Sequence, residues 1–236
     1  MSYPENSMPE TPEPESKREN PHKRYLLERN LQRIKRVLDG ELTPEEASEE
    51  ITQRELELEE RADHDGLTGL LNFQGFTNSL TEDLSIIQQY NIPAFLAFID
   101  IDRLKEFNDT KGKMAGNKLI ETYAKVLENE IAKRPHLPSL TGRFGGDEFV
   151  ALVMGASTED VWQLFEDVRR EIPEAVKRVF QDPNLERTVS IGIVRVQYSD
   201  DAATLLDRAD SKLNQAKGKR NQIIFEEYPL TISEHK

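Results

Sequence analysis

The sequence predicts an α/β domain in which a sheet is flanked by helices, with a helical segment in front of it. Residues 94–99 form a continuous apolar run, which is typical of a strand buried on both faces. Apolar stretches before Arg143 and after Glu148 flank a Gly-Gly pair and indicate a β-hairpin. Apolar residues at helical spacing fill much of the chain between these strands, which favours a layered α/β fold.

The composition limits the classes of function. The 236 residues are enough for one medium domain with a buried core. A net charge of −13 argues against a nucleic acid or an anionic membrane as the partner. Cysteine is absent, and the four histidines show no zinc spacing. No apolar run suits a membrane span and no signal peptide pattern is present, so we expect a soluble cytoplasmic protein.

Two segments precede the domain. Residues 1–22 are rich in Pro, Glu, Ser and Asn, which predicts a disordered tail. Within residues 23–62, a basic helix that stops near Gly40 is followed by an acidic helix that starts at Thr43. The opposite charges indicate a helical hairpin or a dimerising stalk, although two solvated helices packed on the domain fit as well. We expect an unknown regulatory partner to act through residues 24–62.

A turn and a helix lead into the central strand. Residues 63–72 contain two glycines and side chains that close local hydrogen bonds, so we predict a turn followed by a helix from about Gln74 to Tyr90. The apolar run 94–99 then ends in two carboxylates, Asp100 and Asp102. Such a strand end is a common place for metal ligands in α/β enzymes.

The stretch Arg143-Phe144-Gly145-Gly146-Asp147-Glu148-Phe149 is the feature around which the chain is organised. We expect its two glycines to permit positive φ and the close approach of a bulky ligand. Asp147 and Glu148 are expected on opposite faces of the returning strand, one toward a ligand and one toward a metal. By itself the stretch favours an ordinary hairpin that carries solvated acids, and only the other segments of the chain change that interpretation.

The remaining elements follow from regular apolar spacing. They are a helix over about 116–133, a helix over 161–172 that Pro173 is expected to end or kink, a strand over 189–193, a helix over 201–217 and a last strand over 222–225.

Several segments, in the right order, resemble the GGDEF family, the diguanylate cyclases, over about residues 63–226. Besides the Gly-Gly-Asp-Glu-Phe signature, residues 63–72 look like D-x-L-T-G-L-x-N and residues 100–117 are similar to D-x-D-x-F-K-x-x-N-D-x-x-G-H-x-x-G-D. The resemblance implies a GGDEF domain over residues 63–228 with a loose tail over 229–236. It also implies a mixed sheet similar to the palm of nucleotide cyclases and polymerases.

The resemblance implies an active dimer that condenses two GTP molecules into cyclic di-GMP and releases pyrophosphate. Asp147 and Glu148 are the implied catalytic pair. Mg²⁺, or alternatively Mn²⁺, would be held by Asp100, Glu148 and the carbonyl of Ile101, and Asp147 would bind a second metal or help to deprotonate the 3′-hydroxyl. The implied substrate contacts are Lys105, Lys113 and Lys217 near phosphate, Asn108 and Asn117 at the base, and Gly145 and Gly146 where the ligand comes close.

The chain departs from the family pattern at three functional places. Asn117 replaces an aspartate that accepts hydrogen bonds from guanine, and an amide can pair with guanine or adenine. Residues 216–221 are one residue shorter than the usual A-K-x-x-G-R-N spacing. His136 and Ser139 occupy the positions of the inhibitory R-x-x-D site, so we expect no feedback inhibition by that route. Phe73, where the family usually has arginine, is interpreted as a minor departure.

Two other functions therefore stay open. One is a catalytically weak or inactive GGDEF domain that acts as a GTP-binding signalling module. The other is a cyclase with altered base choice, because of Asn117.

Overall fold

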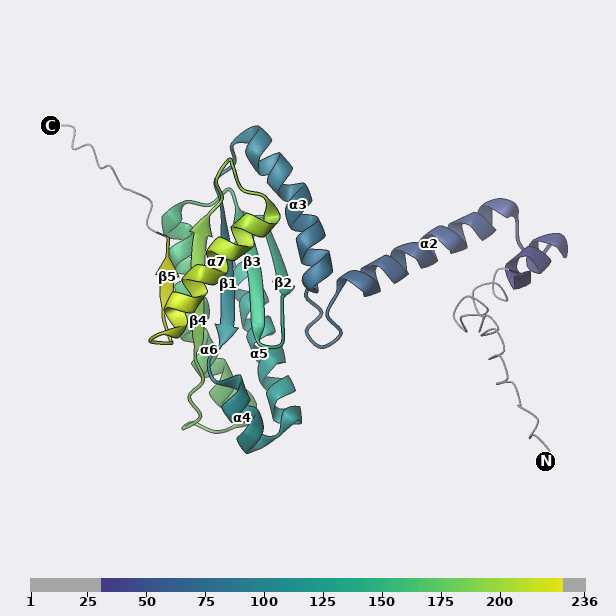
Figure 1. Ribbon diagram of the computed structural model, residues 1–236. Helices are drawn as coiled ribbons and strands as arrows, with labels where there is room; N and C mark the ends of the chain where they lie inside the picture. The colour runs from purple at the N-terminus through teal and green to yellow at the C-terminus, as the bar shows by residue number, and fades with distance from the viewer. Residues whose placement is uncertain (1–30, 227–236) are drawn as a thin grey trace, which may run out of the picture. The chain divides into compact units, whose positions relative to one another are not determined.

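The computed structural model describes residues 31–226, except for the side chains of 55–61 (Figure 1). The predictions for residues 1–22, 24–30 and 229–236 therefore lie outside the described part. Contacts divide the chain into two compact units that meet between Leu58 and Glu59.

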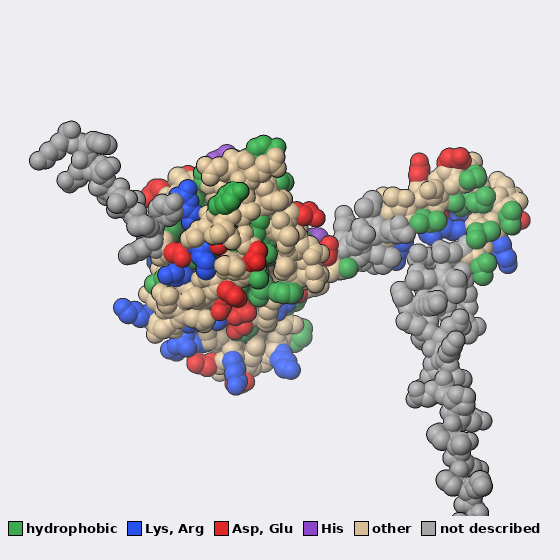
Figure 2. All heavy atoms as spheres, turned by 45° about the horizontal axis from the view of Figure 1, so that its top comes forward, with side chains coloured by type: hydrophobic (Ala, Val, Ile, Leu, Met, Phe, Trp, Pro, Cys, Tyr) green, Lys and Arg blue, Asp and Glu red, His purple; other side chains and the backbone are tan. Residues whose placement is uncertain are grey.

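The described residues of the first unit, from 31 onward, form two helices. Residues 31–38 are helical, and α2 (Pro44–Asp63) starts with a capping box in which Thr43 N–H and Glu46 N–H donate to each other's side chains at 2.8 and 3.2 Å. Ion pairs at 3.1 and 3.3 Å join Arg33 and Arg36 to Glu50, so the basic helix lies against the acidic one. Figure 2 shows hydrophobic side chains gathered on this unit; more than half of Leu31, Ile34 and Leu38 is exposed.

The second unit is built on a mixed sheet with the strand order β2-β3-β1-β4-β5 (Figure 1). All neighbours are antiparallel except β4 and β5, which are parallel. Every residue of the central strand β1 is buried, as the apolar run predicts. The strands are β1 (Ala94–Ile101), β2 (Ser139–Arg143), β3 (Glu148–Met154), β4 (Val189–Arg195) and β5 (Ile223–Phe225).

Helices cover both faces of the sheet and give three layers. Alternate residues of β1 belong to two different hydrophobic clusters, one shared with α3 and α7 and the other with α4, α5 and α6. None of the described helices is long and apolar enough to cross a lipid bilayer. The helices are α3 (Phe73–Tyr90), α4 (Leu104–Lys111), α5 (Lys113–Ala132), α6 (Thr158–Phe180) and α7 (Ala202–Lys217).

Two helices differ from the sequence prediction. Residues 104–111 form α4, where no helix was predicted, because Leu104 and Phe107 are buried under the end of β1. The helix over 161–172 does not end at Pro173 but continues to Phe180. Ala175 and Val176 beyond the proline are buried in the core, so packing outweighs the one backbone hydrogen bond that proline cannot make.

Candidate functional site

The Gly-Gly turn joins β2 and β3 at the edge of the candidate site. Phe144 N–H and Gly145 N–H both donate to the Glu148 carbonyl, at 2.8 and 3.3 Å, and Arg143 Nη2 donates to the Gly146 carbonyl at 2.7 Å. The expected positive φ is wrong, because neither glycine adopts it. A Cβ on Gly145 would instead lie 2.8 Å from Glu148 Oε2, so a side chain there would displace that carboxylate from its present position.

The strand register brings two carboxylates together with a lysine. Asp100 on β1 lies directly opposite Glu148 on β3, so their side chains share one face of the sheet. Lys217 Nζ, at the end of α7, lies 2.8 Å from Asp100 Oδ2 and 3.6 Å from Glu148 Oε1. The Asp147 carbonyl accepts a hydrogen bond from Ile101 N–H at 3.0 Å, which ties the turn to the end of β1.

Burial makes ionisation of Asp100 in this cluster unfavourable. Burial raises the pKa of Asp100 from 3.8 to about 6; the Lys217 ammonium opposes this shift, and the charges of Asp147 and Glu148 add to it. The pKa of Lys217 is raised, because its contacts with the carboxylates outweigh the burial that disfavours its charge. The cluster therefore holds more negative charge than one lysine neutralises.

The donor set suits a hard divalent cation. Two carboxylates and an adjacent main-chain carbonyl, that of Ile101, are oxygen ligands of the kind that Mg²⁺ and Mn²⁺ prefer. Among residues 31–226, no three His, Cys, Asp or Glu side chains are gathered closely enough to hold a metal by themselves. The ammonium already shared by Asp100 and Glu148 shows that this pair accommodates a cation.

The candidate base-reading residues lie on α4 and α5. The Asn108 side chain packs against α5 so closely that a Cβ on Gly116 would lie 1.7 Å from Asn108 Oδ1. This oxygen is buried and accepts no hydrogen bond within the described part of the chain. Asn117 and Lys113 are exposed in the first part of α5. Lys105 is exposed on α4. These four side chains therefore all lie on the two helices that directly follow β1, the strand that carries Asp100.

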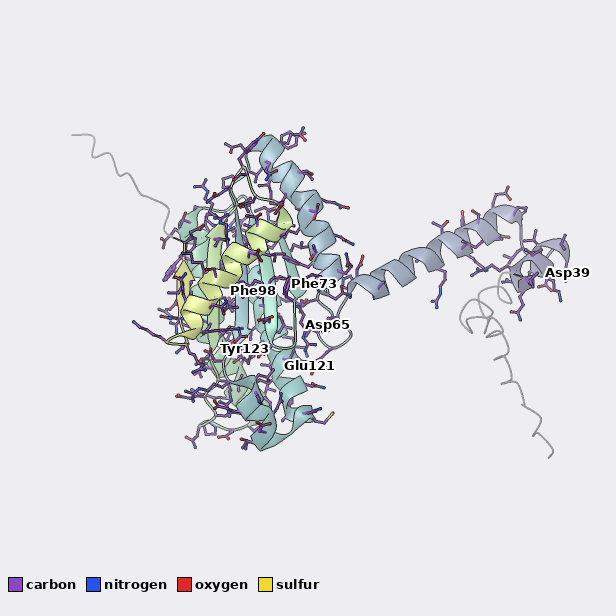
Figure 3. All side chains as sticks on the ribbon, in the orientation of Figure 1. Asp39, Asp65, Phe73, Phe98, Glu121 and Tyr123 are labelled. Carbon is purple, nitrogen blue, oxygen red and sulfur yellow. The ribbon has the colours of Figure 1, made fainter. Side chains whose placement is uncertain are left out.

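Two side chains near the Gly-Gly turn, Asp65 and Phe73, have long-range partners that the sequence does not indicate. Arg143 Nη1 donates to both Asp65 oxygens at 3.1 Å, and so ties the turn of residues 63–72 to the hairpin (Figure 3). Phe73 is half exposed and its ring packs edge-on against Phe144, which packs in the same way against Phe98, with centroids 4.8 and 4.9 Å apart. Both Asp65 and Phe73 stand in recognisable motifs, but no sequence pattern identifies their partners.

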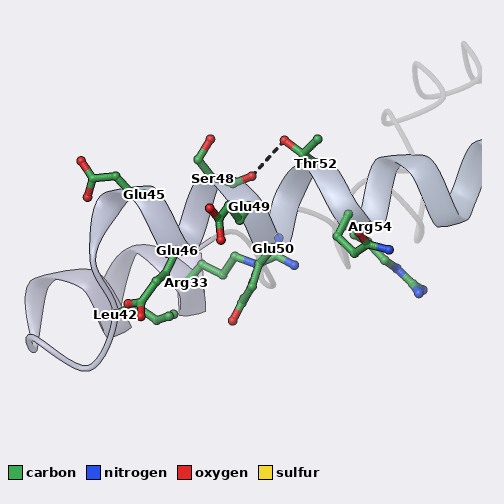
Figure 4. A pocket seen from close by; sticks show the side chains of 10 residues that line it. Arg33, Leu42, Glu45, Glu46, Ser48, Glu49, Glu50, Thr52 and Arg54 are labelled. Atoms are coloured by element: carbon green, nitrogen blue, oxygen red, sulfur yellow. Dashed lines mark hydrogen bonds and ion pairs between the residues drawn. The ribbon is translucent and has the colours of Figure 1, made fainter.

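The large surface hollows lie elsewhere. A hollow of about 1140 Å³ in the first unit is lined by residues of 33–54, among them Glu45, Glu49 and Glu50 (Figure 4). Another, of about 880 Å³, lies between α5 and α6. Neither is lined by a predicted site residue, and the acidic lining of the first is unsuited to a phosphate group.

Comparison with known proteins gives a consistent result. The family model described as "Diguanylate cyclase, GGDEF domain" matches residues 62–222. The diguanylate cyclase DgcP of Pseudomonas aeruginosa is 33% identical over 153 residues, 65% of this chain and 22% of that protein. The diguanylate cyclase DgcM of Escherichia coli K12 is 33% identical over 176 residues, 72% of this chain and 40% of that protein. This chain thus spans less than half the length of either relative.

Solved structures share the fold. The coiled coil and GGDEF domain of DgcB from Caulobacter crescentus, in complex with c-di-GMP, matches with a TM-score of 0.69 and 26% identity, covering 80% of this chain and 100% of that one. The diguanylate cyclase SiaD of P. aeruginosa, in complex with its activator SiaC, matches with a TM-score of 0.63 and 25% identity. The match covers 87% of this chain and 78% of the SiaD chain.

Proposed function

Because the chain belongs to the GGDEF domain family of diguanylate cyclases, we propose that it condenses two GTP molecules into cyclic di-GMP with release of pyrophosphate. The main support is the pair Asp100 and Glu148, which lie opposite each other at one end of the sheet with the Lys217 ammonium between them. The backbone hydrogen bonds of the sheet do not require acids at the ends of these two adjacent strands, so their pairing beside a glycine turn supports a role in binding.

The proposed reaction is an in-line phosphoryl transfer. The 3′-oxygen of each GTP attacks the α-phosphorus of the other, the bond from that phosphorus to the β-phosphate oxygen breaks in each case, and two pyrophosphates leave. Asp100, Glu148 and the Ile101 carbonyl would hold Mg²⁺, which when bound supplies positive charge to the phosphates. Asp147, adjacent to this set, would bind a second ion or accept the proton of the 3′-hydroxyl.

The lysines would neutralise the phosphate chain. In the structure the Lys217 ammonium is engaged by two carboxylates, and a triphosphate would offer it oxygens of higher charge density. Lys105 and Lys113 are exposed on the helices that follow β1 and would add positive charge near the same ligand. These contacts explain how a chain with a net charge of −13 would bind an anionic substrate.

The base would be read by two amides. Asn108 Oδ1 is buried with no partner within the described residues, as expected of an atom that awaits a ligand donor. Asn117, exposed one residue after Gly116, would complete the contact. Its amide pairs with guanine N1–H and O6 or, when flipped, with adenine N1 and N6–H₂, which supports altered base choice as a second candidate function.

The chemistry requires two copies of the chain, because each active site would supply one nucleotide. The exposed apolar residues Leu31, Ile34 and Leu38 follow one another at helical spacing and provide a surface on which two copies would associate. The same unit is the place where a regulatory partner would act. The third candidate, a GTP-binding module without turnover, is favoured only by Asn117 and the shortened segment after Lys217.

A product assay tests the proposal. Purified protein is incubated with Mg²⁺ and GTP, ATP or both, and the products are separated by chromatography; Glu148→Gln is run alongside, with Glu128→Gln on the exposed side of α5 as the charge-matched control. Cyclic di-GMP from GTP alone, lost only in Glu148→Gln, is the expected result. An adenine-containing product supports altered base choice. No product from a folded dimer would refute the enzyme and leave the binding module.

A further inference from the structure

Asp102, directly after β1, is a buried carboxylate that the proposed chemistry does not use. Only 4% of the residue is exposed. It accepts hydrogen bonds from Thr188 Oγ1 at 2.6 Å, Ser190 Oγ at 2.7 Å and Asn221 N–H at 3.0 Å. A buried carboxylate is costly without such charge-assisted hydrogen bonds. Two of the donors belong to the neighbouring strand region, but the third belongs to the turn after α7.

That turn is conformationally strained and held from two sides. Arg220 and Asn221 have φ of +62° and +47°, and two consecutive left-handed residues without glycine persist only where surrounding contacts stabilise them. Asn221 N–H binds Asp102, while Asn221 Oδ1 accepts a hydrogen bond from Arg169 Nη1 of α6 at 2.8 Å. The segment is one residue shorter than the family pattern that it resembles, and these contacts stabilise the tighter path.

The turn determines where α7 ends. Lys217 is the last residue of α7, and helix ends fray when the residues beyond them are not held. Asp102 stands two residues after Asp100, the carboxylate that Lys217 Nζ contacts at 2.8 Å. One strand end therefore carries both the group that the lysine faces and the group that anchors the turn behind the lysine.

We infer that Asp102 is a positioning residue: through Asn221 it holds the end of α7, and so directs the Lys217 ammonium toward the terminal phosphates of a nucleoside triphosphate. This inference rests on the proposed function, since it assigns Lys217 to the substrate's phosphate chain. It adds that the affinity for those phosphates depends on a buried carboxylate that does not touch the ligand.

The test compares ligands with and without terminal phosphates. Calorimetric titration with 3′-deoxy-GTP, which lacks the attacking hydroxyl, measures binding in Mg²⁺ without turnover. GMP reports binding of the base, the sugar and the α-phosphate without the terminal phosphates, and the adenine analogues replace both ligands if the wild type prefers adenine. Asp102→Asn is expected to weaken 3′-deoxy-GTP binding about tenfold and to leave GMP binding unchanged. Ser190→Ala, which removes another hydrogen bond from the same carboxylate, should change neither affinity.

A double variant shows whether Asp102 acts through the lysine. If it does, Asp102→Asn with Lys217→Met binds 3′-deoxy-GTP no more weakly than Lys217→Met alone. Additive losses, or an equal loss for both ligands, would overturn the inference. If Lys217→Met leaves 3′-deoxy-GTP binding unchanged, or the wild type binds no nucleotide, the proposed phosphate site itself fails and the inference with it.

Circular dichroism and thermal melting establish that each variant is folded. If Asp102→Asn does not fold, Arg169→Met tests the inference instead, because it removes the hydrogen bond that holds the Asn221 side chain from α6. It must produce the same loss for 3′-deoxy-GTP with GMP binding retained, and an unchanged affinity for 3′-deoxy-GTP contradicts the positioning role.

Discussion

Replacing Asp100 with asparagine is expected to stabilise the metal-free protein. Folding raises the pKa of Asp100 from 3.8 to about 6, mainly by burial. At neutral pH the ionised side chain therefore opposes folding, by about 3 kcal/mol if each pKa unit corresponds to ~1.4 kcal/mol. The raised pKa of Asp100 already includes the opposing effect of Lys217. The Asp100→Asn variant, which loses the ion pair with Lys217, should therefore still be more stable than the wild type.

Because the pKa of Asp100 is raised on folding, the stability difference between the two proteins develops as the pH rises. The folded state holds the Asp100 proton more tightly than the unfolded state, so below pH 3.8 both states are protonated and the two proteins have equal stability. As the pH rises from 3.8 to about 6, the unfolded wild type ionises first and the wild type loses stability. Above that window the difference reaches its full value and stays constant.

Urea denaturation measures this difference. The single tryptophan, Trp162, lies on α6 and reports unfolding of the sheet unit by fluorescence. With EDTA present, Asp100→Asn should be more stable than the wild type near pH 7.5 and equally stable near pH 3, whereas Asp109→Asn, which removes an exposed acid on α4, should match the wild type at both. Equal or lower stability of Asp100→Asn near pH 7.5 would refute the reasoning. Excess Mg²⁺ should then stabilise the wild type and Asp109→Asn but not Asp100→Asn.

Three further predictions concern the surroundings of the cluster. Gly116→Ala places a methyl 1.7 Å from Asn108 Oδ1, so calorimetry should show nucleotide affinity lowered about tenfold with the fold retained; unchanged affinity would contradict a base contact. Asp65→Asn should lower the free energy of unfolding by about 1.5–3 kcal/mol at pH 7, because it weakens the salt bridge to Arg143. Burial opposes ionisation of Asp65, but hydrogen bonds from its neighbours outweigh it and lower the pKa. The loss of unfolding free energy measured in urea should therefore shrink below pH 3.8, where the carboxylate becomes protonated. A loss that does not change with pH would exclude the ion pair as its cause. Phe73→Ala should cost about 0.5–1.5 kcal/mol of unfolding free energy from its ring contact alone, and no change would mean that the exposed ring does not support the turn.

Most of the strands and helices, and the candidate site residues, could be predicted from local sequence patterns. The apolar run 94–99 predicts a central strand, because a run with no polar face is stable only when it is covered on both sides, and β1 contains the whole run. The hairpin around Gly145 and the capping box at Thr43 follow from equally local rules. The order of the motifs also identified the family, since several short patterns in sequence are specific even where each alone is not.

Only the tertiary structure decided which of these residues meet. Asp100 faces Glu148 because of strand register, and Lys217 reaches both because α7 packs across the sheet. Asp102, which stands beside Asp100 in the sequence, binds a turn 119 residues away instead. The helix through Pro173 likewise continues because of its buried face. Local patterns report periodicity and capping, whereas pairings between distant segments depend on the packing of the whole core, which no short stretch of sequence contains.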